Sequence, residues 1–226
     1  TLKRRYKTFL ELAREKKLNR FINFHPENKG RAPLGFVASG MSYCYLEHAL
    51  FELGLAGKFP ILKLGVTHPL DKSAVREFLN AVDMCVVVEE KRPFLESQFR
   101  AAAQEFSQSE TGNAFHAGAI YGKSFPQGLE GFPEMRGINT SIVMERLGNL
   151  FLKLDLLKED AQRERVRSEL SLIQETADRR VDIALRTPTF CPGCPHRDSA
   201  SVSLKLKKEF ADTDYMREKH ARAPTD

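Results

Sequence analysis

The chain has 226 residues, of which 42% are hydrophobic and 29% are charged. This composition is ordinary for a folded globular protein, and it excludes the collagen-like, disordered and disulfide-scaffold classes. No apolar run approaches the roughly 18 residues of a membrane-spanning helix, so no membrane segment is predicted. At a typical size of about 150 residues per domain, the length predicts one complete domain and part of another.

The net charge of +5 is concentrated at the start of the chain, because residues 1–20 contain eight basic and two acidic side chains. Among them, apolar residues recur at helical spacing at Leu2, Tyr6, Phe9 and Ala13. Residues 1–32 are therefore predicted to be a basic amphipathic helix and a linker. Packing of this helix on its parent protein is preferred to a membrane or an acidic partner. The rest of the chain is nearly neutral, which argues against nucleic-acid binding.

From residue 33 onward, apolar strands alternate with amphipathic helices. Strands are predicted over residues 34–38, 60–64 and 84–88. Residues 107–136, rich in Gly, Ser and Pro, are predicted to be a loop with at most one short strand near 118–121. Helices are predicted over residues 43–53, from an Asp71 cap to about Ala81, from Pro93, and over 141–150 behind an Asn139 cap. Strands separated by helices of about ten residues pair in parallel. Residues 33–152 are thus predicted to form an α/β domain with a doubly wound, mostly parallel sheet.

Ligands of such sheets bind at the carboxyl ends of the strands. Here these loops contain Ser39–Met41, Gly65–His68 and Glu89–Lys91. Neither a glycine-rich dinucleotide fingerprint nor a phosphate loop is present, so no nucleotide site is predicted. Glu89 and Glu90 could act as catalytic carboxylates, but the preferred interpretation is that they end a strand and cap the next helix.

A second amphipathic stripe follows the α/β domain, at Val166, Leu170, Ile173, Ala177, Val181 and Ala184. It predicts a long connecting helix within residues 153–187 that ends before Pro188. Residues 188–226 are predicted to begin a second, incomplete domain with a helix over 199–210. The chain starts with Thr and has no apolar leader, which suggests a segment of a longer polypeptide.

The residues with the clearest chemistry are Cys191 and Cys194, in the stretch Phe-Cys-Pro-Gly-Cys-Pro-His-Arg. The Cys-x-x-Cys spacing allows two thiolates to bind one metal ion or one iron–sulfur cluster, and a redox-active disulfide is the alternative. Cys44 and Cys85 fall in a predicted helix and strand and are interpreted as small buried hydrophobic residues. Further ligands are therefore expected beyond Asp226. The low cysteine content fits a reducing cytoplasm.

This stretch resembles the start of the thiamine-diphosphate domain of the indolepyruvate:ferredoxin oxidoreductases, which are members of the 2-oxoacid:ferredoxin oxidoreductase family. Four further stretches are similar to landmarks of that family and occur in the same order: Leu34–Tyr43, Leu62–Leu70, Val86–Gln98, and the pair Ile120–Lys123 and Asn139–Ser141. The resemblance covers about residues 34–200.

The resemblance implies that residues 33–152 are a middle domain like the C-terminal domain of transketolase, which scaffolds the active site and contributes few catalytic groups. No catalytic residue is predicted in this chain. It implies an enzyme that decarboxylates an aryl 2-oxoacid on thiamine diphosphate and Mg²⁺. Electrons would leave through a [4Fe-4S] cluster to ferredoxin, and the acyl group would pass to coenzyme A. The expected partners are the remaining domains or subunits of a homo-oligomeric parent enzyme.

By the same resemblance, Cys191 and Cys194 are candidate cluster ligands, and His196 is a candidate cofactor-binding residue near thiamine diphosphate. His196 could equally be an ordinary residue of a helix start, and Arg197 a surface residue or an anion contact. The Gly-Asp-Gly and Asn motif that holds magnesium and diphosphate does not occur in the chain. The 226 residues alone are therefore expected to bind no thiamine diphosphate and to be inactive. A zinc-binding or purely structural module is the alternative function.

Overall fold

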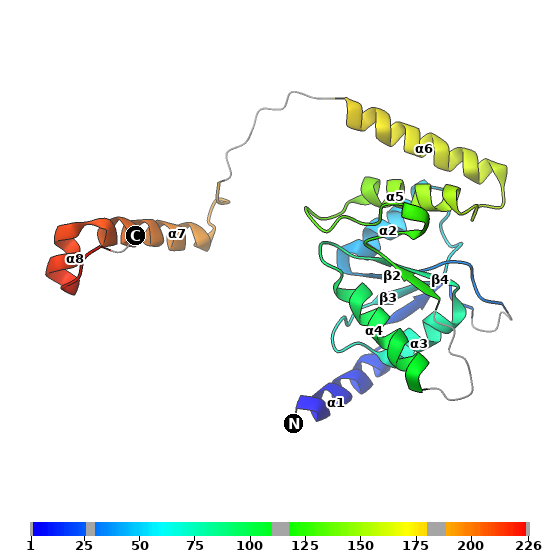
Figure 1. Cartoon of the computed structure of the whole chain (residues 1–226), viewed down its shortest axis with the longest axis horizontal. Helices are drawn as coiled ribbons and strands as arrows, with labels where there is room; N and C mark the ends of the chain where they lie inside the picture. Colours follow the sequence, from blue (N-terminus) through cyan, green and yellow to red (C-terminus); the bar gives the residue numbers. More distant parts are fainter. Residues whose placement is uncertain (1, 26–29, 110–117, 180–188, 225–226) are drawn as a thin grey trace. The chain divides into compact units, whose positions relative to one another are not determined.

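A computed structural model describes residues 2–25, 30–109, 118–179 and 189–224 (Figure 1). The chain divides into two compact units, residues 1–179 and 180–226. The first unit contains a sheet with helices on both faces, and the described part of the second contains two helices. No helix in the described ranges is long and apolar enough to cross a membrane.

The sheet of the first unit has five strands in the order β1-β3-β2-β4-β5. The strands are β1 (Arg20–Ile22), β2 (Gly35–Ser39), β3 (Ile61–Leu64), β4 (Met84–Val88) and β5 (Ala119–Tyr121). Strands β2 to β5 are parallel, and β1 runs antiparallel along the edge of β3. The predicted doubly wound, mostly parallel α/β fold is confirmed, and its likeness to the transketolase domain stays a prediction.

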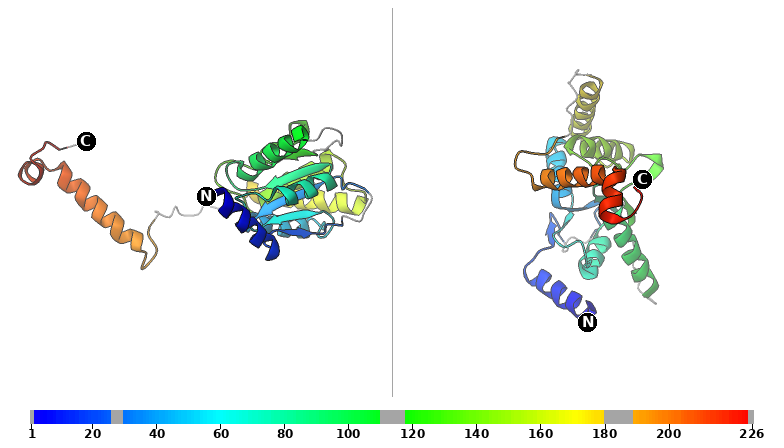
Figure 2. Two further views of the ribbon diagram at one scale, coloured as in Figure 1. Left: turned by 90° about the horizontal axis from the view of Figure 1, so that it is seen from below. Right: turned by 90° about the vertical axis from the view of Figure 1, so that its left-hand side faces the viewer.

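Helices cover both faces of this sheet. Figures 1 and 2 show α5 (Thr140–Lys153) and α6 (Asp160–Asp178) on one side, and α3 (Lys72–Ala81) and α4 (Phe94–Ser109) on the other. Helix α2 (Gly40–Glu52) shares a core with α5. The amino-terminal helix α1 (Leu2–Glu15) precedes β1, and a 3₁₀ turn (Pro126–Gly128) precedes α5.

The central strands are buried on both faces, which explains their continuous apolar sequences. Phe36 and Val86 point into the core under α2 and α5, whereas Val37 and Val87 point into the core under α3 and α4. On the first side, the rings of Phe59 and Phe151 stack with centroids 5.2 Å apart.

Helix α6 packs on α5 through a close approach at Gly148. A Cβ atom added at Gly148 would lie 3.0 Å from a methyl carbon of Leu170, so this glycine sets the separation of the two helices. Val166 of α6 is fully buried in the same core. The described part of the predicted connecting helix is therefore a packed layer of the first unit. Val181 and Ala184 lie outside the described residues.

The structure corrects three details of the sequence prediction. Strand β1 lies where only a helix and a linker are predicted, because a three-residue strand carries too little pattern to be recognised. Helix α2 begins at Gly40 rather than Tyr43, since Gly40 adopts a φ of +53° that lets β2 run directly into the helix. Helix α4 continues to Ser109, into the predicted loop.

The described part of the second unit, residues 189–224, contains α7 (Pro195–Ala211) and α8 (Thr213–His220). Asp212 ends α7 and caps α8, accepting hydrogen bonds from the backbone N–H groups of Asp214 and Tyr215. The rings of Phe210, Tyr215 and His220 pack together, and Met216 is buried. Helix α7 extends the predicted helix in both directions, and α8 is not predicted.

Candidate functional site

The carboxyl ends of the parallel strands form the edge at which α/β sheets bind ligands. Helix α2 leaves β2 toward one face of the sheet, and α4 leaves β4 toward the other. The chain therefore diverges between β2 and β4, which is the position of a binding crevice in this architecture. The side chains at the ends of these two strands determine whether this edge can bind a ligand or support catalysis.

Glu89, directly after β4, caps helix α4. Its buried carboxylate accepts hydrogen bonds from the backbone N–H groups of Leu95 (2.7 Å) and Glu96 (3.0 Å). Burial raises the pKa of Glu89, and the two N–H groups oppose that rise. The capping interpretation of Glu89 agrees with these bonds. Glu90 is exposed.

Glu96 connects helix α4 to the segment after β5. Its side chain is buried, accepts a 2.9 Å hydrogen bond from the backbone N–H of Lys123, and pairs with Arg100 at 2.6 Å. The ammonium group of Lys123 in turn donates to the backbone carbonyl of Glu89 at 2.8 Å. Burial lowers the pKa of Lys123. All of these charged groups are occupied in joining β4, α4 and β5, which is a structural role.

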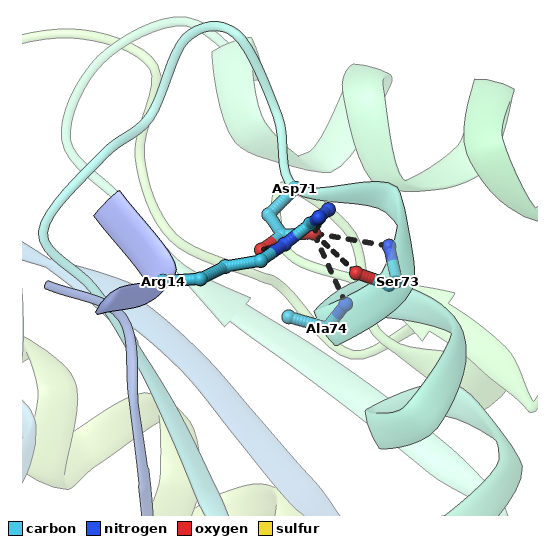
Figure 3. A network of polar contacts seen from close by, with 4 residues as sticks. All are labelled: Arg14, Asp71, Ser73 and Ala74. Carbon is cyan, nitrogen blue, oxygen red and sulfur yellow. Dashed lines mark hydrogen bonds and ion pairs between the residues drawn. The ribbon is translucent and has the colours of Figure 1, made fainter. Parts of the chain in front are cut away.

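A third buried carboxylate, Asp71, caps the start of helix α3 after the β3 loop. Its side chain accepts from the backbone N–H groups of Ser73 (3.1 Å) and Ala74 (3.4 Å), so the predicted cap is confirmed. Figure 3 shows Arg14 of α1 reaching the same carboxylate, with two bonds of 2.8 and 2.7 Å. The Arg14 guanidinium lowers the pKa of Asp71 to about 2. The arginine is 57 residues away in the sequence and could not be predicted.

Large apolar side chains are exposed around the carboxyl edge. Met41 follows β2 and is 59% exposed, and Phe94 begins α4 and is 54% exposed. Met135 is 79% exposed, in a loop whose Gly137 lies beside Glu90. This set of residues, Met41, Phe94 and Met135, is called the edge patch below. Exposed apolar side chains at this edge are available for contact with another protein or a ligand.

The Cys-x-x-Cys motif lies in the second unit, at the start of α7. Gly193 adopts a φ of +75°, and the backbone N–H of Cys194 donates to the carbonyl of Cys191 at 3.0 Å. This turn places two free thiols, one exposed and one half-exposed, within one short loop. The Sγ atom of Cys194 lies 3.3 Å from Nδ1 of His196, which is also exposed.

Two thiols and an imidazole are accessible at this turn, but they do not complete a metal site. Within the described residues, no group of three or more His, Cys, Asp or Glu side chains is arranged to hold a metal ion.

Of the other two cysteines, Cys85 is fully buried, as predicted, and burial raises the pKa of its thiol. The prediction for Cys44 is wrong, because α2 turns Cys44 to solvent while Tyr43 and Leu46 face the core.

A hollow of about 640 Å³ lies at the opposite, amino end of the sheet, beside Phe24, Arg31 and Lys58. Its arginine is engaged structurally, since Arg31 pairs with Asp83 at 2.7 Å and donates to the carbonyl of Leu79 at the end of α3. We therefore do not assign a catalytic role to this hollow.

Comparison with known domain families matches the chain to the indolepyruvate oxidoreductase domain over residues 25–180. The indolepyruvate oxidoreductase subunit IorA of Methanothermobacter thermautotrophicus is 33% identical over 186 residues, covering 82% of this chain and 24% of the relative. The Archaeoglobus fulgidus subunit of the same name is 28% identical over 204 residues, covering 89% and 28%.

The chain spans about a quarter of the length of these curated relatives. No solved structure matches it at a significant level.

Proposed function

The chain belongs to the indolepyruvate oxidoreductase domain family, and from this premise we propose that it is a segment of an enzyme that oxidatively decarboxylates an aryl 2-oxoacid such as indolepyruvate. The carboxyl group leaves as CO₂, the acyl group is transferred to coenzyme A, and two electrons pass one at a time to ferredoxin. The observation that carries the proposal is the family match over most of the first unit, followed by the Cys-x-x-Cys turn.

In this proposal the first unit scaffolds the active site and performs no chemistry. Two observations support this role. The charged groups Glu89, Glu96 and Lys123 are all bonded within the unit, so none is held ready for a substrate. The edge patch, in contrast, is exposed and offers contact area to the remaining domains of the longer enzyme. Thiamine diphosphate and Mg²⁺, which supply the decarboxylation chemistry, would be held largely by those other domains.

Cys191 and Cys194 are proposed as two of the four ligands of a [4Fe-4S] cluster. Their donor chemistry fits, because thiolates are the usual ligands of such clusters and the turn holds both thiols in one loop. The other two ligands would come from elsewhere in the enzyme. His196, next to Cys194, is proposed to contact thiamine diphosphate or the substrate carboxylate.

The experiment that tests the function is an activity assay of the full-length subunit, purified anaerobically with its partner subunit. Indolepyruvate should drive reduction of a one-electron acceptor, and the reaction should depend on added coenzyme A and thiamine diphosphate. If the enzyme contains its full complement of iron and thiamine diphosphate yet reduces no acceptor with any aryl 2-oxoacid, the proposal is wrong. Stoichiometric zinc in place of iron would favour the metal-binding alternative.

A further inference from the structure

Helix α1 presents an apolar face that the rest of the described chain does not cover. Leu2 is 62% exposed, Phe9 is 41% exposed and Leu12 is 47% exposed, although α1 is attached to a well-packed unit. Together with Arg4, Arg5 and Thr8, Phe9 and Leu12 line an open hollow of about 490 Å³. The residues Leu2, Arg4, Arg5, Thr8, Phe9 and Leu12 are called the outer face of α1 below.

The helix is held firmly at its carboxyl end. Ala13 is buried, and Arg14 makes its two-bond ion pair with Asp71 (Figure 3). Asn19, just beyond the helix, accepts hydrogen bonds from the backbone N–H groups of Gly65 and Val66, both at 3.1 Å. Figure 1 shows the amino-terminal end of α1 furthest from the sheet. The carboxyl end of the outer face, at Leu12, therefore lies next to the anchored part of the helix, which reduces the entropy lost when this face binds.

The charges on the outer face specify the chemistry of its partner. Within the part of the chain that the structure describes, no carboxylate pairs with Arg4 or Arg5. Two arginines beside exposed Leu and Phe side chains match a surface that combines apolar residues with Asp or Glu. A second copy of α1 would bring the same cations together, so like-charge repulsion disfavours a symmetric contact through this face.

A separate polypeptide fits these charges better than another part of the same chain. Concentrated charge accelerates the encounter of two free molecules, whereas domains of one chain are already held together at high effective concentration. A lipid surface fits less well. An amphipathic helix lies in a membrane with its whole apolar stripe free, and the stripe of α1 ends at Ala13, which is buried in the fold.

We infer that the outer face of α1 is the docking site for a partner subunit whose contact surface is apolar with an acidic rim. The inference rests on the proposed function, because the family relatives are named as subunits of an oxidoreductase. A 14-residue helix is about 21 Å long and covers less than a standard interface. Helix α1 is therefore one element of a larger contact.

Photo-crosslinking in the holoenzyme tests the docking directly. The full-length subunit is produced with p-benzoylphenylalanine at Thr8, in the outer face, or at Lys7 as a matched control one position away and turned by about 100°. The Thr8 probe should crosslink to the partner subunit, and the Lys7 probe should not. Crosslinks only within the same chain or to a second copy, equal yields from both positions, or no crosslink at all would overturn the inference.

Charge reversal provides a second measurement on separately purified subunits. Arg4→Glu with Arg5→Glu should lower the association rate constant about tenfold and weaken its dependence on salt. The helix itself should persist, because acidic residues are favourable in a first turn that has none. The control pair Lys158→Glu and Arg167→Glu, exposed and away from α1, should leave association unchanged. An unchanged rate in the α1 variant would contradict the inference.

Binding to vesicles of phosphatidylglycerol and phosphatidylcholine tests whether an anionic membrane is the partner of the outer face instead. One outcome would contradict the inference: the subunit binds these vesicles, and the Arg4→Glu, Arg5→Glu variant loses this binding but still associates normally with the partner subunit. The outer face of α1 would then bind an anionic membrane and not a protein. None of these readouts requires turnover. A holoenzyme that crosslinks at Thr8 but does not oxidise indolepyruvate would thus refute the proposed function alone.

Discussion

At the scale of single residues, buried carboxylates mark the starts of helices rather than a catalytic centre. Asp71 and Glu89 each follow a strand and accept backbone N–H groups of the next helix. Their difference lies in the neighbouring cation. Arg14 lowers the pKa of Asp71 to about 2, whereas burial raises the pKa of Glu89. The two sites are therefore expected to respond differently to substitution and to pH.

Replacing Asp71 with Asn keeps a side chain that can cap α3 but removes the ion pair with Arg14. The free energy of unfolding should fall by about 1 to 2 kcal/mol at pH 7, since Asp71 is buried but Arg14 is half-exposed. A carboxyl with a lowered folded-state pKa stabilises the fold above its unfolded pKa and loses that contribution as the pH falls toward about 2. Urea unfolding of both proteins should show a gap that is constant above pH 5 and shrinks below pH 4. A gap independent of pH would contradict this.

Glu89→Ala should lower the free energy of unfolding by about 1 to 3 kcal/mol, because it leaves the N–H groups of Leu95 and Glu96 without their acceptor. The matched control is Glu90→Ala, the exposed neighbour, which should change it by less than about 0.5 kcal/mol. Chemical denaturation of the two variants measures both. Equal effects at the two positions would show that Glu89 does not act as the cap of α4.

At the scale of elements, local patterns predict most helices and strands, and contacts distant in sequence account for what is missed. The apolar run over Met84–Val88 and the capping residues Asp71 and Asn139 predict β4, α3 and α5 closely. Strand β1 is not predicted, because only its pairing with β3 makes those three residues a strand. The exposure of Cys44 is missed for the same reason, because it depends on which face of α2 packs against α5, a helix about 100 residues further along the chain.

In the candidate site, too, features set by neighbouring residues can be predicted from the sequence, and features set by distant residues cannot. Glu89 as a cap and the Cys-x-x-Cys turn can be predicted, because both depend on neighbours within a few residues. The bonds from Glu96 to Lys123 and from Arg14 to Asp71 cannot be predicted, because their partners lie 27 and 57 residues apart. Periodicity within a segment contains no information about such pairs.

The contact between α5 and α6 provides a test at this scale. Gly148→Leu should force the helices apart, because even a Cβ atom at this position lies within 3.3 Å of three side-chain carbons of Leu170. Overpacking of this kind should lower the free energy of unfolding by about 1 to 3 kcal/mol. Asn149→Leu, on the exposed side of the same helix, is the control and should be nearly neutral. Thermal unfolding of both variants distinguishes a packed α6 from a loosely attached one.

At the scale of the whole molecule, the two units differ in how much core they have. The first contains two extensive apolar cores on either side of its sheet, whereas Met216 is the single buried hydrophobic residue among the described residues of the second. The first unit should therefore fold without the second. A chain ending at Arg179 should unfold cooperatively with a midpoint within about 2 °C of the full chain. A midpoint lowered by 10 °C or more would contradict this independence.

The sparse core of the second unit is consistent with its proposed place in a larger enzyme. Val202, Leu204, Leu206 and Phe210 of α7 are exposed, and a longer polypeptide offers the area to cover them. The cysteine turn stands at the start of the same helix, so the ordering of α7 and the binding of a cluster are expected to depend on the rest of the enzyme.

Ligation of an iron–sulfur cluster by the Cys-x-x-Cys turn is tested by the iron content and the low-temperature EPR spectrum of the reduced, full-length holoenzyme carrying Cys191→Ser or Cys194→Ser. The control is Cys44→Ser, an exposed cysteine in the first unit. If the Cys-x-x-Cys turn ligates the cluster, each of the two variants loses about four irons per subunit and one cluster signal relative to the control. If both variants retain the iron content and the spectrum of the control, Cys191 and Cys194 are not cluster ligands.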